Sequence, residues 1–258
     1  MRIILLKSEE EIELIREGAD ILSRVHGEIA RTIKPGVTTH QLDELAEAYI
    51  RDHGGSPSFK GYKRFPATLC TSVNEYVVHG FPNHNALEEG DIVSVDCGVY
   101  YKGFHSDAAF TYPVGAVSKE VRCLLQVTQE ALYLGIEEAK AGNRTGDIGN
   151  AIQEHVQKHG YSVVRELVGH GVGRNLHEDP QVPNYGKKGS GTRLKQGVVL
   201  AIEPMINLGK RQIVEERGGQ FRTLDRKPSA HFEHTVAVLE NKTEILTTYR
   251  YIEEVFKL

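Results

Sequence analysis

The stretch Leu87-Glu-Glu-Gly-Asp-Ile-Val-Ser-Val-Asp96 returns 107 residues later as Leu194-Lys-Gln-Gly-Val-Val-Leu-Ala-Ile-Glu203. Each copy has a leucine, a glycine three residues on, a run rich in apolar residues and a carboxylate at the end. Such a run is typical of a buried strand. The repeat therefore predicts two related strands that each place one carboxylate at the same position.

A second match lies upstream of the first, at an offset of 106 residues. Residues 33–39 (Ile-Lys-Pro-Gly-Val-Thr-Thr), followed by Leu42 and His53-Gly54, correspond to residues 139–145 (Ala-Lys-Ala-Gly-Asn-Arg-Thr), followed by Ile148 and His159-Gly160. This period is too long for a solenoid repeat. We therefore expect one catalytic domain, residues 1–258, with half-repeats at about 8–115 and 116–250 and a site where the halves meet.

Each half is predicted to run helix, turn, helix and then strands. Ser8 and Glu11 form a capping box for the first helix. The other helices are expected to begin at Thr38 or Thr39, at Ser118 and at Thr145, the strands to cover 93–99, 104–112, 198–206 and 231–239, and residues 183–193 to form a surface loop. Helices and strands in separate blocks predict an α+β fold, with helices covering a mostly antiparallel sheet.

The composition excludes several classes of protein. The 258 residues are 40% hydrophobic and 26% charged, with a net charge of −4, which indicates neither disorder nor a surface for nucleic acid. No apolar run is long enough to span a bilayer, and the N-terminal apolar block is too short for a secretory signal. The three cysteines are widely spaced, without a C-x-x-C pair. We expect a cytoplasmic protein that is monomeric and has no membrane partner.

Asp96 and Asp107 flank a predicted hairpin. A turn at Tyr101-Lys102 would place the aspartates directly opposite each other, and a turn at Lys102-Gly103 would make them diagonal neighbours. Because side chains alternate along a strand, both registers leave the two carboxylates on one face. Like charges that close repel, and a metal ion would remove the conflict. The alternative is a solvent-facing pair, which the apolar neighbours disfavour.

Two more carboxylates stand in apolar strands. Glu203 lies in Gly-Val-Val-Leu-Ala-Ile-Glu-Pro, and Glu233 in Ala-His-Phe-Glu-His-Thr-Val-Ala-Val. A buried glutamate is costly unless it is paired or bound to a cation. One such residue would be explained by an ion pair, but four favour a metal site. Oxygen ligands with one histidine suit Mn, Fe, Co or Zn, and five side chains could hold two ions.

The histidine of such a site is predicted to be His170, which lies between glycines in Gly-His-Gly-Val-Gly. Flanking glycines let the backbone approach closely and leave the imidazole unobstructed. His79 has the same His-Gly form. We expect surface or structural roles for His26, His53, His84, His155 and His159.

These residues stand in the order found in the type I methionine aminopeptidases, which the chain resembles over almost its whole length. The motifs are Ser-Val-Asn-Glu-Tyr-Val-Val-His-Gly (72–80), Gly-His-Gly-Val-Gly-Arg (169–174), His-Glu-Asp-Pro-Gln-Val (177–182), Ile-Glu-Pro-Met (202–205) and Phe-Glu-His-Thr (232–235). The resemblance implies the "pita-bread" fold, two αβ halves about a pseudo-twofold axis with a central, curved and mostly antiparallel sheet. It also implies removal of the initiator methionine from nascent proteins when the second residue is small.

The resemblance assigns a role to each matching residue. It implies that Asp96 chelates one metal, that His170 and Glu203 bind the other, and that Asp107 and Glu233 bridge both. A hydroxide between the ions would attack the first peptide bond, with Glu203 as a proton shuttle. It further implies that His79 contacts the scissile amide nitrogen and that His177 stabilises the oxyanion.

The same resemblance extends beyond the metal centre. It implies a methionine pocket at Tyr62, Phe65 and Cys70, and a monovalent cation (Na or K) near Asn74, Tyr76 and Ser229. The chain departs from the family at Lys63, where histidine is usual, at Leu176, where phenylalanine is common, and near residues 218–220, where a tryptophan is usual. Transient association with the ribosome is a further expectation.

Three alternatives are weighed against this interpretation. Proline-specific relatives (aminopeptidase P, prolidase) share the fold and ligands but normally carry an extra N-terminal domain, for which the first half-repeat leaves no room. A catalytically dead binding scaffold, as in the proliferation-associated proteins, would have lost ligands. A structural ion-pair network would not require His79 and His177 in their motifs.

Overall fold

The computed structural model describes residues 4–216 and 218–256. Its order of elements begins with two helices and continues into strands. These elements are α1 (Glu9–Thr32), α2 (Thr39–Asp52), β1 (Ser56–Pro57), a 3-10 turn (Tyr62–Arg64), β2 (Leu69–Val73), β3 (Tyr76–Val78), β4 (Ile92–Tyr101) and β5 (Phe104–Pro113). The expected surface loop at 183–193 contains no strand or helix, and Lys187–Gly191 at its centre are exposed.

The second part of the chain again starts with two helices and continues into strands. Its elements are α3 (Lys119–Glu137), α4 (Thr145–Lys158), β6 (Ser162–Val163), β7 (Gly169–Gly171), β8 (Glu178–Val182), β9 (Val199–Ile202), β10 (Met205–Asn207), β11 (Ile213–Glu215), β12 (Phe221–Thr223), β13 (Ser229–His231), β14 (His234–Val238), β15 (Thr243–Ile245) and α5 (Arg250–Glu253). No described helix is long and apolar enough to cross a membrane.

The helices begin where capping chemistry predicts. Ser8 caps α1 and Thr38 caps α2, each in a capping box with the side chain three residues later. Ser118 caps α3 through its hydroxyl, which accepts from the Val121 amide. Thr145 is the first residue of α4, and the residue before it is the cap.

Two of the predicted strands are broken where a carboxylate stands. The expected strand at 198–206 is divided into β9 and β10 by Glu203-Pro204, because proline has no N–H for the ladder. The expected strand at 231–239 is divided into β13 and β14 at Phe232-Glu233. Both glutamates therefore lie between two strands rather than within one.

All strand pairs among the described residues are antiparallel. They form four sheets, in the orders β1-β4-β2 with β5 beside β4, β13-β10-β6, β11-β12-β3 and β15-β14-β9-β7-β8. A bridge between Ala109 and Glu233 joins β5 to the segment before β14, and Thr235 exchanges two hydrogen bonds with the backbone of Asp107. The sheets are therefore continuous through the place where the carboxylates gather.

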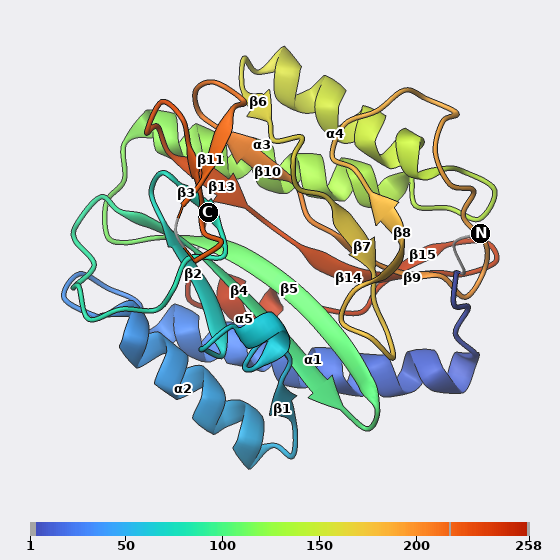
Figure 1. Ribbon diagram of the computed structural model, residues 1–258, viewed down its shortest axis with the longest axis horizontal. Coiled ribbons are helices and arrows are strands. Elements are labelled where there is room, and N and C mark those ends of the chain that lie inside the picture. The colour runs from blue at the N-terminus through green and yellow to red at the C-terminus, as the bar shows by residue number, and fades with distance from the viewer. Residues whose placement is uncertain (1–3, 217, 257–258) are drawn as a thin grey trace.

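The helices enclose this layer of strands. Figure 1 shows α1 and α2 along one side of the strands and α3 and α4 along the other. Helix α1 packs on β4 and β5, and α3 packs on β10 and β13. The main apolar core fills the space between them and includes Leu22, Val95, Leu132 and Ile202. These observations confirm the α+β prediction.

Candidate metal centre

The β4–β5 hairpin takes the second of the two registers left open by its sequence. Lys102 and Gly103 form the turn, with φ values of 46° and 91°, and Tyr101 pairs with Phe104. This register places Asp96 opposite Ala109, and Gly98 opposite Asp107. The two aspartates are diagonal neighbours on one face, as the side-chain alternation predicts.

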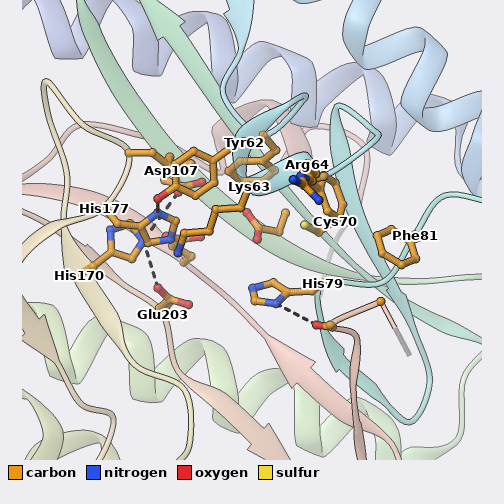
Figure 2. A pocket seen from close by; sticks show the side chains of 17 residues that line it. Tyr62, Lys63, Arg64, Cys70, His79, Phe81, Asp107, His170, His177 and Glu203 are labelled. Carbon is orange, nitrogen blue, oxygen red and sulfur yellow. Dashed lines mark hydrogen bonds and ion pairs between the residues drawn. The ribbon is translucent and has the colours of Figure 1, made fainter. Parts of the chain in front are cut away.

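One pocket of about 340 Å³ receives all the predicted ligands. Its lining includes Asp96, Asp107, His170, Glu203 and Glu233 together with His79, His177, Tyr62, Phe65 and Cys70. Figure 2 shows the side chains of His170, His177, Asp107 and Glu203 converging at one end and Cys70 and Phe81 at the other. The structure therefore brings together ten of the residues singled out in the sequence.

Three carboxylate oxygens at the base of this pocket are buried without a hydrogen-bond partner: Asp96 Oδ1, Asp107 Oδ1 and Glu233 Oε1. Burial, with the neighbouring carboxylates, raises the pKa of Asp107 and of Glu233 well above their ordinary values. Burial also raises the pKa of Asp96 to about 7. Carboxylates left unpaired in a dry site are costly unless a cation joins them.

His170 supplies a nitrogen lone pair to the same place. Its Nδ1 lies 2.9 Å from the carbonyl oxygen of Gly171, to which an Nδ1–H donates. The other nitrogen, Nε2, then carries the lone pair and lies 3.9 Å from Asp107 and 3.5 Å from Glu203. Ligand atoms of Asp107, His170 and Glu233 lie within 4.8 Å of one another. This donor set fits a divalent ion.

The glycines around His170 are explained by the sheet. A Cβ on Gly169 would lie 2.5 Å from the Ala201 carbonyl oxygen, and a Cβ on Gly171 would lie 2.5 Å from that of Asp179. Both distances are impossible for a real side chain, so only glycine lets β7 lie between β8 and β9 with the imidazole in place. The glycines thus serve close backbone approach, as predicted.

Glu203 lies between two imidazoles. Its Oε1 is 3.5 Å from His170 Nε2 and its Oε2 is 3.6 Å from His231 Nε2. Burial raises the pKa of Glu203 to about 7. Its backbone carbonyl accepts a 2.9 Å hydrogen bond from the side-chain amide of Asn184.

His231 is a site residue that the sequence interpretation missed. It is 1% exposed, and neither ring nitrogen has a hydrogen-bond partner. A signal was available, because His231 stands two residues before Glu233 in a stretch read as a strand, where both would share a face. The expected structural role of His26 holds, since it is buried with hydrogen bonds to Tyr112 and Ala108.

His79 and His177 stand at the rim of the pocket and are neutral near pH 7. Partial burial, together with the charges of His170 and Lys63, lowers the pKa of His177 to about 3. Partial burial also lowers the pKa of His79. His79 Nδ1 donates to the Gly219 carbonyl at 3.3 Å, and His177 Nδ1 lies 2.9 Å from the Tyr62 hydroxyl.

An apolar cluster forms the other wall of the pocket. Phe59, Cys70 and Leu176 are its buried members, and Tyr62 and Phe65 pack against them. Burial raises the pKa of the Cys70 thiol well above its ordinary value, so this cysteine stays neutral. The cluster has the character of a pocket for a thioether side chain.

The proposed monovalent cation site is brought together only in part. The backbone N–H of Ser229 donates a 2.9 Å hydrogen bond to the Asn74 carbonyl oxygen, so these two residues are neighbours. The Asn74 side chain is already bonded to Asp91 and to the Ile92 amide. The Tyr76 hydroxyl points instead to Glu216, at 3.1 Å.

Unpaired buried carboxylates around an imidazole lone pair, beside an apolar pocket, define a metal-dependent hydrolase. Comparison with known proteins gives the same class. The model of metallopeptidase family M24 matches residues 13–240. A methionine aminopeptidase from Clostridium perfringens is 51% identical over 95% of this chain and 98% of that protein.

Solved structures share the architecture. The crystal structure of a methionine aminopeptidase from Rickettsia prowazekii superposes with a TM-score of 0.94 at 39% identity, over 95% of this chain and all of that one. A prolidase from Pyrococcus furiosus has a TM-score of 0.74 at 25% identity and is covered to 65%. The chain therefore belongs to metallopeptidase family M24, as one of its methionine aminopeptidases, and has the pita-bread fold.

Proposed function

We propose that this chain removes the N-terminal methionine from nascent polypeptides and peptides when the second residue is small. The observation that carries the proposal is the pairing of unpartnered buried carboxylates with an apolar pocket in one cavity. The carboxylate end would cleave, and the apolar end would select the side chain of the first residue.

The proposed ligands are Asp96, Asp107, His170, Glu203 and Glu233, with Asp107 and Glu233 shared between two ions. Their mostly oxygen donor set is compatible with Co, Mn, Fe or Zn. Two divalent ions held there would lower the pKa of a bound water to near neutrality and polarise the scissile carbonyl. Burial of the carboxylates keeps other water away from them, which strengthens each electrostatic interaction.

The remaining chemistry belongs to the protein side chains. Because His79 Nδ1–H donates to Gly219, the Nε2 lone pair of His79 can accept a hydrogen bond from the scissile amide N–H. If the Tyr62 hydroxyl donates to His177 Nδ1, the Nε2–H of His177 can donate to the developing oxyanion. Glu203, whose carboxylate lies beside the other proposed ligands, can carry the proton from the nucleophilic water to the departing amine.

The methionine side chain would lie against Phe59, Tyr62, Phe65, Cys70 and Leu176. Thioether sulfur packs well against aromatic rings, and none of these residues is charged. Leucine at 176 leaves this wall apolar and buried, at 3% exposure. The departure from the family at Leu176 is therefore compatible with a methionine pocket.

The proposal extends to the setting of the enzyme. We infer one catalytic domain over residues 1–258, with half-repeats at about 8–115 and 116–250, acting as a monomer in the cytoplasm. Its substrates would be nascent chains, met during transient ribosome association. A monovalent cation (Na or K) near Asn74, Tyr76 and Ser229 is supported by the proximity of Asn74 to Ser229.

The test is release of free methionine by protein stripped with a chelator and then supplied with Mn, Co, Fe or Zn in turn. Met-Gly and Met-Ala peptides should be cleaved, whereas peptides with a bulky second residue should not. Acetyl-Met-Ala peptides and Leu-Ala peptides control for the free amine and for the first side chain. Absence of release with every ion, from protein shown to be folded, would refute the proposal.

A further inference from the structure

Two cations stand at the mouth of the pocket without acidic partners. Lys63 and Arg64 are both exposed and are the only lysine or arginine among the described pocket-lining residues. Neither has an ion pair with a described acidic residue. Other surface cations of this chain form ion pairs with acidic side chains, as Lys60 does with Glu47 at 2.6 Å.

The backbone holds both side chains at this place. Lys63 has φ 47° and Arg64 has φ 70°, two consecutive left-handed residues that are not glycine. Such residues cost energy and persist only where the surrounding loop fixes them. The loop is fixed by backbone hydrogen bonds between Gly61 and Phe65, and from Arg64 to Gly61.

The Lys63 ammonium points toward the reacting end of the pocket. It lies 5.3 Å from the centre of the Tyr62 ring, which stacks on His177 at 5.2 Å. Its charge also contributes to the lowered pKa of both His79 and His177. Figure 2 shows the Lys63 side chain extending toward His170 and His177.

Among the described residues, the only acids that line the pocket are the four carboxylates at its base. With two divalent ions bound, four positive charges balance these four negative charges. The base then offers Lys63 at most the single negative charge of the proposed hydroxide. Because Lys63 and Arg64 are exposed members of the pocket lining, a substrate that extends out of the pocket on their side would pass both of them.

We propose that Lys63 and Arg64 form an anion subsite that recognises a carboxylate located one or two residues beyond the scissile bond. This proposal rests on the proposed aminopeptidase function. The carboxylate can be an acidic side chain at the third substrate position or the C-terminal carboxylate of a di- or tripeptide. An exposed ion pair of this kind improves kcat/KM about two- to fivefold.

The experiment compares matched peptides with the metal-loaded enzyme. Met-Ala-Glu-Ala-amide against Met-Ala-Gln-Ala-amide reports the side-chain carboxylate, and Met-Ala-Ala against Met-Ala-Ala-amide reports the terminal one. Wild type, Lys63→Gln, Arg64→Gln and the double variant are assayed, with Lys188→Gln on the distant exposed loop as the control. Thermal melting and metal content are measured on every variant.

The wild type and Lys188→Gln are expected to prefer the carboxylate peptides about two- to fivefold, through KM with kcat unchanged. Lys63→Gln should lose most of this preference and the double variant all of it, without change in melting or metal content. The wild-type preference should also fall as ionic strength rises from about 0.05 M to about 0.5 M. A salt-sensitive KM distinguishes recognition from a structural role.

The two proposals fail differently. If the neutral amide peptides release no methionine at all, the proposed function fails. If they are cleaved as well as the carboxylate peptides by the wild type, the anion subsite alone is refuted. A preference that survives the double variant would also overturn the assignment to Lys63 and Arg64.

Discussion

The Nε2 atom of His170 and the Oε1 atom of Glu203 lie 3.5 Å apart. This separation is too long for a normal N–H···O hydrogen bond. It matches two ligands of one ion, since atoms about 2.1 Å from a metal are roughly 3.0–3.6 Å apart at common ligand angles. The two side chains are thus spaced as ligands of one cation rather than as partners in a hydrogen bond.

Replacement of His170 by alanine should therefore weaken metal binding. We expect at least a tenfold loss of affinity for the more weakly held ion, because one of its few ligands is gone. Titration of Mn²⁺ or Co²⁺ followed by calorimetry checks this. His155→Ala, which removes a histidine on α4 far from the pocket, should bind as the wild type does; equal affinities in all three proteins would contradict the assignment.

Glu203→Gln should stabilise the metal-free protein above neutral pH. The pKa of Glu203 rises from 4.5 when unfolded to about 7 when folded, so ionisation in the folded state is unfavourable. The cost is absent below about pH 4.5, grows as the pH rises and is complete above about pH 7. We expect a gain of about 1–3 kcal/mol at pH 8, from urea unfolding in EDTA.

The pH dependence of this gain is the sharper test. The difference in free energy of unfolding between Glu203→Gln and wild type should vanish near pH 4.5. Buried histidines such as His26, whose pKa is lowered to about 4, have the opposite pH dependence, but they contribute equally to both proteins and cancel. With metal bound the order should reverse, because the wild type alone keeps this ligand. If the difference in free energy of unfolding were the same at all pH values, ionisation of Glu203 would not be its cause.

His79→Ala should lower turnover while leaving metal content intact. The imidazole is proposed to contact the scissile amide, and no described carboxylate lies within ion-pair distance of it. Loss of one positioned hydrogen bond to the reacting group typically reduces the rate about 10²- to 10³-fold. Turnover is compared with metal content from atomic emission. Loss of both ions would place His79 among the ligands and contradict its proposed role.

Tyr249→Phe should destabilise the protein and loosen Glu233. The buried Tyr249 hydroxyl accepts from the Glu233 amide at 3.0 Å and lies 2.7 Å from the Ala109 carbonyl and 2.9 Å from that of Glu233. Removing it takes the hydroxyl donor from the buried Glu233 carbonyl, while the Glu233 amide keeps its bond to Ala109, at a cost of about 1–3 kcal/mol. Thermal unfolding measures this, with exposed Tyr100→Phe as the neutral control. An unchanged melting temperature would refute the role of the hydroxyl.

Much of the fold was predictable because its signals are local. Capping at Ser8, Thr38 and Ser118 depends on residues within one turn of helix, and the apolar strands are read directly from hydrophobicity. The interruption at Phe232-Glu233 could not be read this way. It depends on Tyr249 and Ala109, which are distant in sequence and act only after the sheets meet.

The same limit applies to the site: features set by neighbouring residues were predictable, and features set by residues distant in sequence were not. The shared face of Asp96 and Asp107 follows from strand alternation in either register, whereas the register itself depends on two left-handed residues in the turn. His231 was missed although its spacing from Glu233 was informative. Its importance becomes visible only when Glu203, which lies 28 residues earlier in the break between β9 and β10, is placed 3.6 Å away.

The Tyr249 contact also determines when the Glu233 segment can be completed during synthesis of the chain. Tyr249 follows every proposed ligand along the chain, and it holds the bridge between Ala109 and Glu233. A copy still emerging from the ribosome can form α1 and the β4–β5 hairpin early, but Glu233 gains its contacts with the Tyr249 hydroxyl only when Tyr249 arrives. An enzyme proposed to act on nascent chains would therefore complete its own proposed metal centre only near the end of its synthesis.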